Sequence, residues 1–469
     1  MRFVMPKYTR KEIKKSIKTK KMSLGNDLPV IQINACGIDI GGESIFVCVP
    51  RDRDSIPIRE FSAFTADLRE MAEWLKKCNI TTIAMESTGV YWIPVFEVLD
   101  EYGFDVQLVN AHHVKNVPGR KTDVSDSEWI QRLHSFGLLS GSFRPVDEVV
   151  VFRSYVRHRN TLSQRAADQL NYAQKALEQL NIKLGYAIND ISGVTGSRII
   201  EDIIRGERDP LKLAMHRDGR CKAPEEVIAK SLEGNWREEH LLSLKHAWEA
   251  YLFFHKQIIE CEQAIEKLLE GFDKKDIPEE QLARAKKGHR KRVCNKSPYY
   301  FDMRSQLHKW AGVDICALPG INENIASRIL SETGKNMEKW KSIKHFSSWL
   351  AVCPGNKISG GKRLSGKTKP SKNRAREALG MAALTLAHSD SYLGAYYRKM
   401  RAKHGASKAN RAAAHKMAKI IYIMLKYGKE FVELTQHDFE NQHKEKTIAN
   451  MQKRAKDLGF KLVPISAAA

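Results

Sequence analysis

The sequence predicts an α/β N-terminal domain, a long helical and coiled-coil middle region, and a mainly α C-terminal domain. Short apolar runs alternate with amphipathic segments between residues 31 and 148. Between residues 149 and 299, apolar residues recur in steps of three and four, which is typical of a heptad seam. Residues 300–435 are rich in Ala, Gly and Lys and are expected to be helical. Residues 1–30 form a basic extension, and residues 436–469 form a polar tail.

The N-terminal domain is expected to hold a sheet with helices on it. Gly41-Gly42 separates two apolar runs and predicts a β-hairpin. The expected strands are 30–40, 44–50, 59–64, 81–88 and 104–110, and the expected helices are 65–79, 91–103 and one that begins within 118–139. Pro94 is expected in the first turn of its helix, where its missing N–H is tolerated. The order βββαβαβα is that of a ribonuclease-H-like, RuvC-like sheet.

Two apolar seams lie in the middle region. The first comprises Ala166, Leu170, Ala173, Leu177, Leu180 and Leu184, and the second comprises Ala247, Tyr251, Phe254, Ile258, Cys261, Ile265 and Leu268. We expect one long helix over 150–184 and a second along the other seam. The two can pair within one chain or between chains, and the pattern leaves both open. Residues 185–243 are expected to be a helical insertion, and 272–299 to carry an exposed basic loop.

The charge of the chain predicts a polyanionic partner. The 469 residues carry 78 Lys and Arg against 55 Asp and Glu, a net charge of +23. Nucleic acid fits best, because neutralising phosphates releases counterions. No apolar run is long enough to span a membrane, and none resembles a signal peptide, so we expect a cytoplasmic, nucleoid-associated protein of a bacterial or archaeal cell. The eight scattered cysteines are expected to be reduced and mostly buried.

Four acids are candidates for a metal site. Asp39 and Glu86 end two expected strands, and Asp123 and Asp126 lie on one face of the helix that follows. A ribonuclease-H-like sheet would bring them together at one edge, where four carboxylates would bind two Mg²⁺ ions for phosphodiester chemistry. Each acid also has an ordinary alternative: a turn residue, or a helix N-cap at Asp123. Arg120 and Lys121, directly before this pair, are candidate nucleic-acid contacts.

Two segments of the C-terminal domain are candidates for DNA contact. Residues 317–334 are similar to a helix-hairpin-helix, in which Gly320 would offer its backbone to a phosphate, although an ordinary helical core element is the alternative. Residues 353–379 contain Ser359 followed by two glycines among cations, so Ser359 is a candidate nucleophile and Ser365 a second one. The candidate phosphate-binding residues around it are Lys357, Gly360, Gly361, Lys362, Arg363, Lys367, Lys369, Lys372 and Arg374.

Both halves of the chain resemble one family. "GIDIGGESIFV", "AMESTGVYWIPVFEVL" and "VNAHHVKNVPGRKTDVSDSEWIQRLHSFGLL" are similar to the N-terminal DEDD domain of the insertion-sequence 110/1111 transposases. "LPGINENIASRILSETG" and "CPGNKISGGKRLSGKTKPSKNRAREALGMAA" are similar to their C-terminal domain. The resemblance covers about 31–180 and 313–430. The chain departs from it in a basic N-terminal extension, in extra length at 185–245 and 272–312, and in Ile358, where relatives often have Ser.

The resemblance implies a DNA recombinase. It implies that Asp39, Glu86, Asp123 and Asp126 bind Mg²⁺, and that Ser359 attacks DNA to leave a phosphoserine link. It also implies composite sites built from different subunits and a structured non-coding RNA that selects donor and target DNA. We further expect dimers that assemble to a tetramer on DNA. Three alternatives remain open: a metal-only RuvC-like nuclease, a non-catalytic nucleic-acid-binding or RNA chaperone protein, and a sugar kinase, which "GIDIGG" also resembles.

Overall fold

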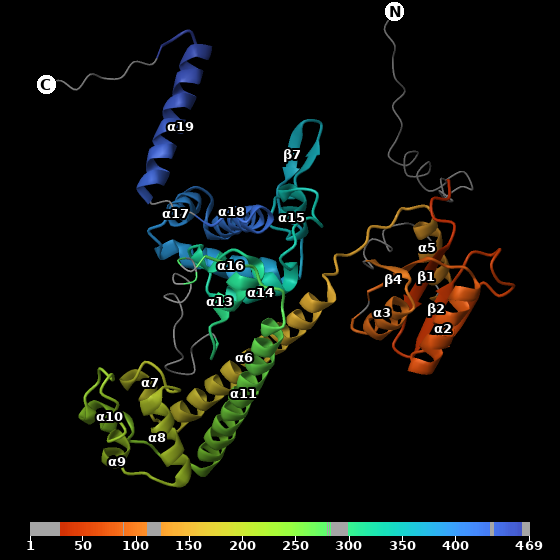
Figure 1. Ribbon diagram of the computed structural model, residues 1–469. Helices are drawn as coiled ribbons and strands as arrows, with labels where there is room; N and C mark the ends of the chain where they lie inside the picture. Colours follow the sequence, from red (N-terminus) through yellow and green to blue (C-terminus); the bar gives the residue numbers. More distant parts are fainter. Residues whose placement is uncertain are drawn as a thin grey trace, which may run out of the picture. The chain divides into compact units, whose positions relative to one another are not determined.

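The computed structural model describes residues 29–87, 89–109, 123–278, 280, 282, 299–431 and 436–461. They form two compact units that divide between Arg144 and Pro145 (Figure 1). The first unit is mixed α/β and the second is mostly helical. No helix in these ranges is long and apolar enough to cross a bilayer. Most of the basic extension, Arg120, Lys121, most of the basic loop within 272–299 and the end of the tail lie outside them.

The first unit is built on one five-stranded sheet. Its strands are β1 (Ala35–Ile40), β2 (Ser44–Cys48), β3 (Ile58–Ser62), β4 (Thr82–Glu86) and β5 (Asp105–Val109). Their order is β3-β2-β1-β4-β5, with β1, β2 and β3 antiparallel and with β4 and β5 parallel to β1. Each expected strand is present, and the order is consistent with a ribonuclease-H-like sheet.

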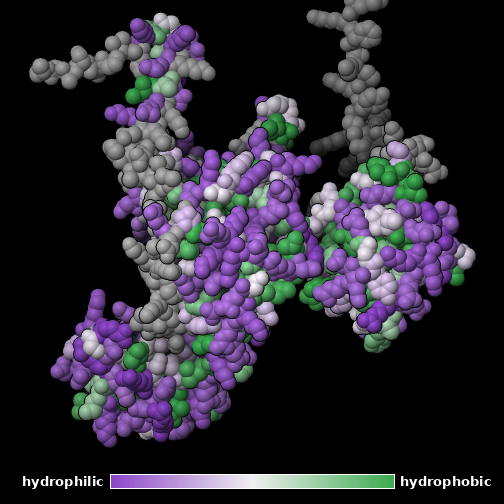
Figure 2. Space-filling model, in the orientation of Figure 1, coloured by the Kyte–Doolittle hydropathy of each residue, from purple (hydrophilic) through white to green (hydrophobic). Residues whose placement is uncertain are grey.

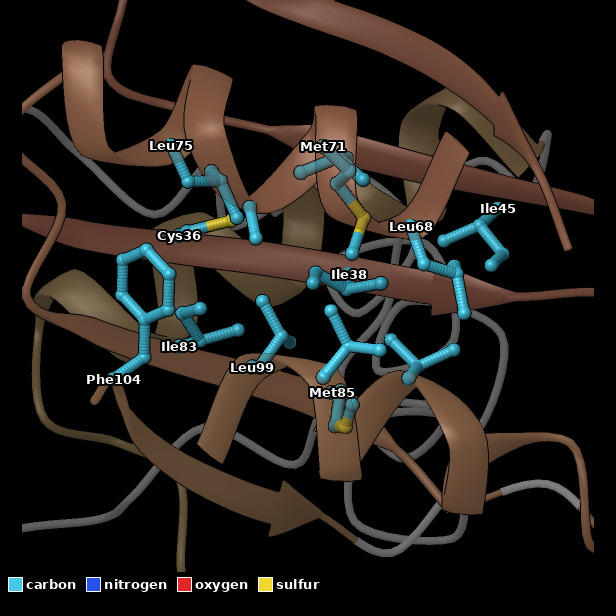
Figure 3. Close-up of a cluster of buried hydrophobic side chains, with 14 of the residues drawn as sticks. Cys36, Ile38, Ile45, Leu68, Met71, Leu75, Ile83, Met85, Leu99 and Phe104 are labelled. Atoms are coloured by element: carbon cyan, nitrogen blue, oxygen red, sulfur yellow. The ribbon is translucent and has the colours of Figure 1, made fainter. Parts of the chain in front are cut away.

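Helices cover both faces of this sheet. Helices α2 (Thr65–Lys77) and α3 (Trp92–Glu101) lie on one face, and α5 (Asp123–Ser135) packs on the other. Because side chains alternate along a strand, Cys36 and Ile38 point into the core with α2 and α3, where they meet Leu68, Met71 and Leu99 (Figure 3). The odd-numbered residues of β1 therefore face α5. Pro94 is the third residue of α3, which confirms its expected place in the first turn.

Two long helices form an antiparallel hairpin in the second unit. They are α6 (Asp147–Gln179) and α11 (Glu238–Glu270), and they pack along each other within the chain. The first ends at Gln179 and not at 184, because Asn181 adopts a left-handed conformation with φ of 59°. The insertion between them is helical: α7 (Leu184–Ala187), α8 (Val194–Arg205), α9 (Pro210–Ala214) and α10 (Glu225–Ser231) lie at the far end of the hairpin (Figure 1). Pairing of these helices between chains stays a prediction.

The C-terminal part of the second unit is mainly helical. Its helices are α13 (Met303–Ala311), α14 (Glu323–Thr333), α15 (Ile343–Trp349), α16 (Arg374–Thr385), α17 (Tyr392–His404), α18 (Ala406–Tyr427) and α19 (Gln436–Asp457), with short 3-10 turns at Ile315–Ala317 and Leu386–His388. Arg157 of α6 makes two 2.8 Å hydrogen bonds to the carboxylate of Glu332 on α14. Arg153 donates to the last carbonyls of the same helix. These contacts hold the N-terminal part of α6 against α14.

The described cysteines are free thiols, as expected. Four of the seven are buried, at positions 36, 48, 78 and 261. Burial raises the pKa of Cys48 to about 12 and raises the pKa of Cys36 well above its ordinary value. These thiols are therefore protonated packing groups at neutral pH and not nucleophiles.

Candidate functional site

Asp39 and Glu86 occupy matched positions on neighbouring strands. The parallel register of β1 and β4 pairs Ile38 with Met85. Asp39 and Glu86 are the next residues, so they take the next matched position. Neighbouring strands lie about 4.8 Å apart, and residues at matched positions point to the same face. The two carboxylates, one half-buried and the other 9% exposed, are therefore neighbours on one face of the sheet.

Helix α5 runs antiparallel to β1 on this face. The side-chain amide of Gln131 donates to the carbonyl oxygen of Ala35, with 3.3 Å between Nε2 and O. Two residues along the strand, a Cβ at Gly37 would lie 2.4 Å from the carbonyl oxygen of Ser127. Two strand residues advance about 6.6 Å, and four helix residues advance about 6 Å, so the two elements stay in step. The next step places Asp39 opposite the first turn of α5.

Strand β4 and α5 match in the same way, with two strand residues for every four helix residues. The hydroxyl of Thr82 and Nε2 of His134 are 2.9 Å apart. Two residues on, Ala84 packs against Ile130 in a small buried cluster. The same spacing then places Glu86 one helical turn nearer the start of α5. Two independent sets of contacts therefore bring the ends of β1 and β4 to the same helical turn.

That turn carries the other two candidate acids. Asp123 is the first residue of α5, and Asp126 is the fourth. Negative charge is favourable at a helix N-terminus, because the unpaired N–H groups leave partial positive charge there. Asp126 is half-buried, and the side chain of Asp123 lies outside the described atoms.

The chemistry of this acid set suits hard divalent cations, which prefer oxygen ligands. Asp39, Glu86 and Asp126 supply only carboxylate oxygens. Among side chains that the structure describes, no three or more His, Cys, Asp or Glu lie close enough together to hold a metal ion. The backbone of the N-terminal unit thus brings the four positions to one edge, and a full ligand set requires the side chain of Asp123.

Ser359 lies at the tip of a β-hairpin. The hairpin consists of β6 (Lys357–Ser359) and β7 (Lys362–Ser365) (Figure 1). Its register pairs Ser359 with Lys362. Gly360 and Gly361 have φ of 54° and 74°, as a two-residue type I′ turn requires. A Cβ at either glycine would meet nothing within 4 Å, so the turn conformation and not a close contact demands glycine here. The structure thus places a strand pair where the sequence predicted a loop.

The Ser359 side chain is exposed and has no hydrogen-bond partner among the described residues. No described side chain is therefore positioned as its base. The described candidate cations Lys362, Lys367, Lys369, Lys372 and Arg374 are all exposed, while the side chains of Lys357 and Arg363 lie outside the description. Hydrophilic residues cover most of the visible surface of the second unit (Figure 2). The alternative serine, Ser365, is half-buried, and its Oγ accepts from the backbone N–H of Lys367 at 3.3 Å.

Gly320 has a structural role. Its φ is 87°, and a Cβ there would lie 2.6 Å from the carbonyl oxygen of Ala382 on α16. Asn322 caps the following helix by accepting from the N–H of Ile325 at 2.9 Å. The apolar residues expected to pack inward, Ile321, Ile325, Ile329 and Leu330, are all buried. These observations explain the glycine without a phosphate, and the helix-hairpin-helix interpretation stays a prediction.

Two residues that hold the acid site were not singled out from the sequence. Gly37 lets the backbone of α5 approach β1, and His134 bonds to Thr82 at the other end of the same face. Burial lowers the pKa of His134, so this imidazole is neutral at pH 7. A glycine inside a strand is a signal of close backbone approach and could have identified Gly37. No comparable signal marks a buried histidine within an amphipathic helix.

Two transposase family models match separate parts of the chain. Residues 36–182 match a transposase family model of the IS110 DEDD type. Residues 313–398 match a second model, described as transposase of the IS116/IS110/IS902 family. The first match spans the acid-bearing sheet and α5, and the second spans the serine hairpin. No curated protein matches the chain. Two models of one family, in their expected order, identify the chain as a transposase that belongs to the IS110 family.

Proposed function

We propose that this transposase cuts and rejoins DNA with two chemical centres, the acid site of the first unit and Ser359 of the second. The observation that carries the proposal is the register that makes Asp39 and Glu86 neighbours and brings both to the turn of Asp123 and Asp126. Carboxylates there would hold Mg²⁺, and the complete set of four would hold two ions. Bound Mg²⁺ would supply charge stabilisation at a phosphodiester.

Ser359 is the proposed nucleophile. Its Oγ attacks a backbone phosphorus, the bond from phosphorus to the leaving deoxyribose oxygen breaks, and a phosphoserine link forms. Attack on this link by a hydroxyl end of a second strand releases the serine and completes the transfer. Because no described side chain bonds to the hydroxyl, we assign removal of its proton to the acid site, of the same or of a partner subunit.

Donor and target DNA are the proposed substrates, and a structured RNA encoded beside the gene is the proposed guide. The net charge of +23 supports several polyanionic partners bound together. We also propose that subunits assemble as dimers and then as a tetramer on DNA. Sequencing the nucleic acid that co-purifies with the protein tests the guide. A discrete RNA from one locus supports it, and a random sample of cellular RNA contradicts it.

A metal-only nuclease is the second candidate function. The absence of a base beside Ser359 among the described side chains favours it. A nicked DNA substrate that traps covalent intermediates separates the two. Transposition through serine requires protein attached to the DNA, whereas hydrolysis by the acid site alone cuts the strand and leaves no attachment.

A further inference from the structure

Arg376 contacts the segment that follows the serine hairpin. It is the third residue of α16, and it is 8% exposed. Its Nη1 donates to the carbonyl oxygens of Lys369 at 3.1 Å and Ser371 at 3.4 Å. Its Nε is buried and has no hydrogen-bond partner among the described residues. The guanidinium therefore holds the segment that follows the hairpin, and its Nε–H has no acceptor among the described residues.

A second arginine lies beside it on α18. Asn410 donates to the carbonyl oxygen of Gly380, one turn beyond Arg376 on α16, at 2.7 Å. The next residue, Arg411, is half-buried. Burial and the positive charge of Arg376 lower the pKa of Arg411. No carboxylate in the described part of the chain forms an ion pair with either arginine.

The surroundings of this pair are also cationic. Residues 356–376 contain eight Lys and Arg and no acid, and the carboxylate of the next residue, Glu377, lies 3.9 Å from Arg328. Along α18, His415 and Lys419 follow Arg411 at intervals of four residues, which places the three on one helix face. Burial and the charge of Lys419 lower the pKa of His415, so this histidine is neutral at pH 7 and adds no further positive charge.

Two partly buried like charges without a counter-charge destabilise a fold. A binding anion removes that penalty, and guanidinium groups match the geometry of phosphate oxygens. We propose that Arg376 and Arg411 bind one phosphate of a DNA strand at the base of the Ser359 hairpin. This inference rests on the proposed function, in which DNA binds at the hairpin that carries Ser359.

The site also couples DNA binding to the hairpin. Arg376 donates to the carbonyl oxygens of Lys369 and Ser371, in the segment that joins β7 to α16. A phosphate held by the two guanidinium groups would therefore lie at a defined position relative to Ser359. Both arginines are positioning residues in this proposal, because neither touches the serine.

The test compares Arg411→Gln with the wild-type full chain by fluorescence anisotropy. The probe is a labelled 30-base-pair DNA duplex titrated at several salt concentrations. Loss of one phosphate contact should reduce the slope of log affinity against log salt by about 0.9. Arg165→Gln is the matched control, because Arg165 is exposed on α6 and makes no contact with this site. Arg411→Lys should restore part of the affinity, because it keeps the charge but loses the planar fork.

Thermal unfolding without DNA gives the second readout. An anion site predicts that Arg411→Gln raises the melting temperature or leaves it unchanged, because the substitution removes repulsion from Arg376. A purely structural arginine predicts a lower melting temperature, and that result would overturn the proposal. An unchanged salt slope for DNA would do the same, as would a loss of affinity confined to an RNA hairpin used as the competing probe.

The measurement separates this inference from the proposed function. Binding is measured in the Ser359→Ala background, where no covalent link can form through that serine. If DNA binding responds to Arg411 but wild-type protein never attaches to DNA, the phosphate site stands and the nucleophile is wrong. If protein attaches to DNA but Arg411→Gln does not change DNA binding, the phosphate site is wrong and the nucleophile stands.

Discussion

Gly37 of β1 and Ser127 of α5 meet backbone to backbone: a Cβ on the glycine would lie 2.4 Å from the serine carbonyl oxygen and 2.1 Å from the amide nitrogen of Gln131. No L-residue with a side chain fits this position without moving the helix. The contact sets the distance between α5 and the sheet at Gly37, two residues before Asp39 on the same strand face. It therefore sets where the acids on the helix lie relative to those on the strands.

Gly37→Ala should lower the free energy of unfolding of the first unit by about 1–3 kcal/mol, the usual cost of overpacking. It should also abolish DNA cleavage, because the displaced helix carries Asp123 and Asp126. Thermal unfolding and a cleavage assay measure the two effects. Gly219→Ala is the control, since a Cβ there meets nothing within 4 Å. Equal behaviour of the two variants would show that the close approach is unimportant.

Asp126→Asn should reduce strand cleavage by two orders of magnitude or more, roughly the effect of removing a group that stabilises transition-state charge. Affinity for DNA should not fall, because the substitution removes a negative charge near a polyanion. Asp100→Asn on the exposed face of α3 is the matched control. A variant that still cuts at the wild-type rate across a Mg²⁺ titration would exclude Asp126 from the metal site.

His134 should make the first unit sensitive to acid. Its pKa is lowered by burial in the folded state and is about 6.5 in the unfolded chain. Below pH 6.5 His134 binds a proton in the unfolded chain but stays neutral in the folded chain. The free energy of unfolding therefore falls as the pH drops below 6.5. His134→Gln lacks this term, so its melting temperature should approach that of the wild type between pH 7.5 and 5.5. A gap that stays constant with pH would count against the assignment.

The buried ion pair of Arg159 and Glu262 should matter far more than exposed pairs. Two guanidinium nitrogens lie 2.9 and 2.8 Å from one oxygen of Glu262, and the backbone N–H of Tyr300 donates to the other at 3.0 Å. Glu262→Gln leaves a buried charge without its partner and should cost about 3–5 kcal/mol. Arg205→Gln, which breaks an exposed pair with Asp202, should cost less than about 1 kcal/mol. Urea unfolding measures both, and similar costs would contradict this ranking.

The sheet and its helices could be predicted because each has a strong local pattern. Alternating apolar residues and the glycines at 41–42 indicated β1 and β2, and the apolar face of residues 68–75 indicated α2. The long helix was predicted too far, because the apolar spacing continues through Leu184 while Asn181 reverses the backbone. Heptad spacing reports which residues are buried and says nothing of a break in the backbone between them.

The candidate site was predictable in its members but not in its geometry. Asp39 and Glu86 were identified as strand ends, yet their shared register depends on pairing between residues almost fifty positions apart. The serine hairpin was expected as a loop, because β6 and β7 are short and have only one apolar residue each, Ile358 and Leu364. Arg376 was not singled out among eight cations, since its burial is a tertiary property.

Covalent attachment of DNA to Ser359 tests the account most directly. Wild-type protein is incubated with Mg²⁺ and a nicked duplex that carries the ends of its insertion sequence, and the trapped adduct is digested and sequenced by mass spectrometry. We predict a nucleotide attached to the peptide that contains Ser359, no adduct from Ser359→Ala, and an undiminished yield from the control Ser365→Ala. An adduct on Ser365, or cleaved DNA without any attached protein, would contradict the account.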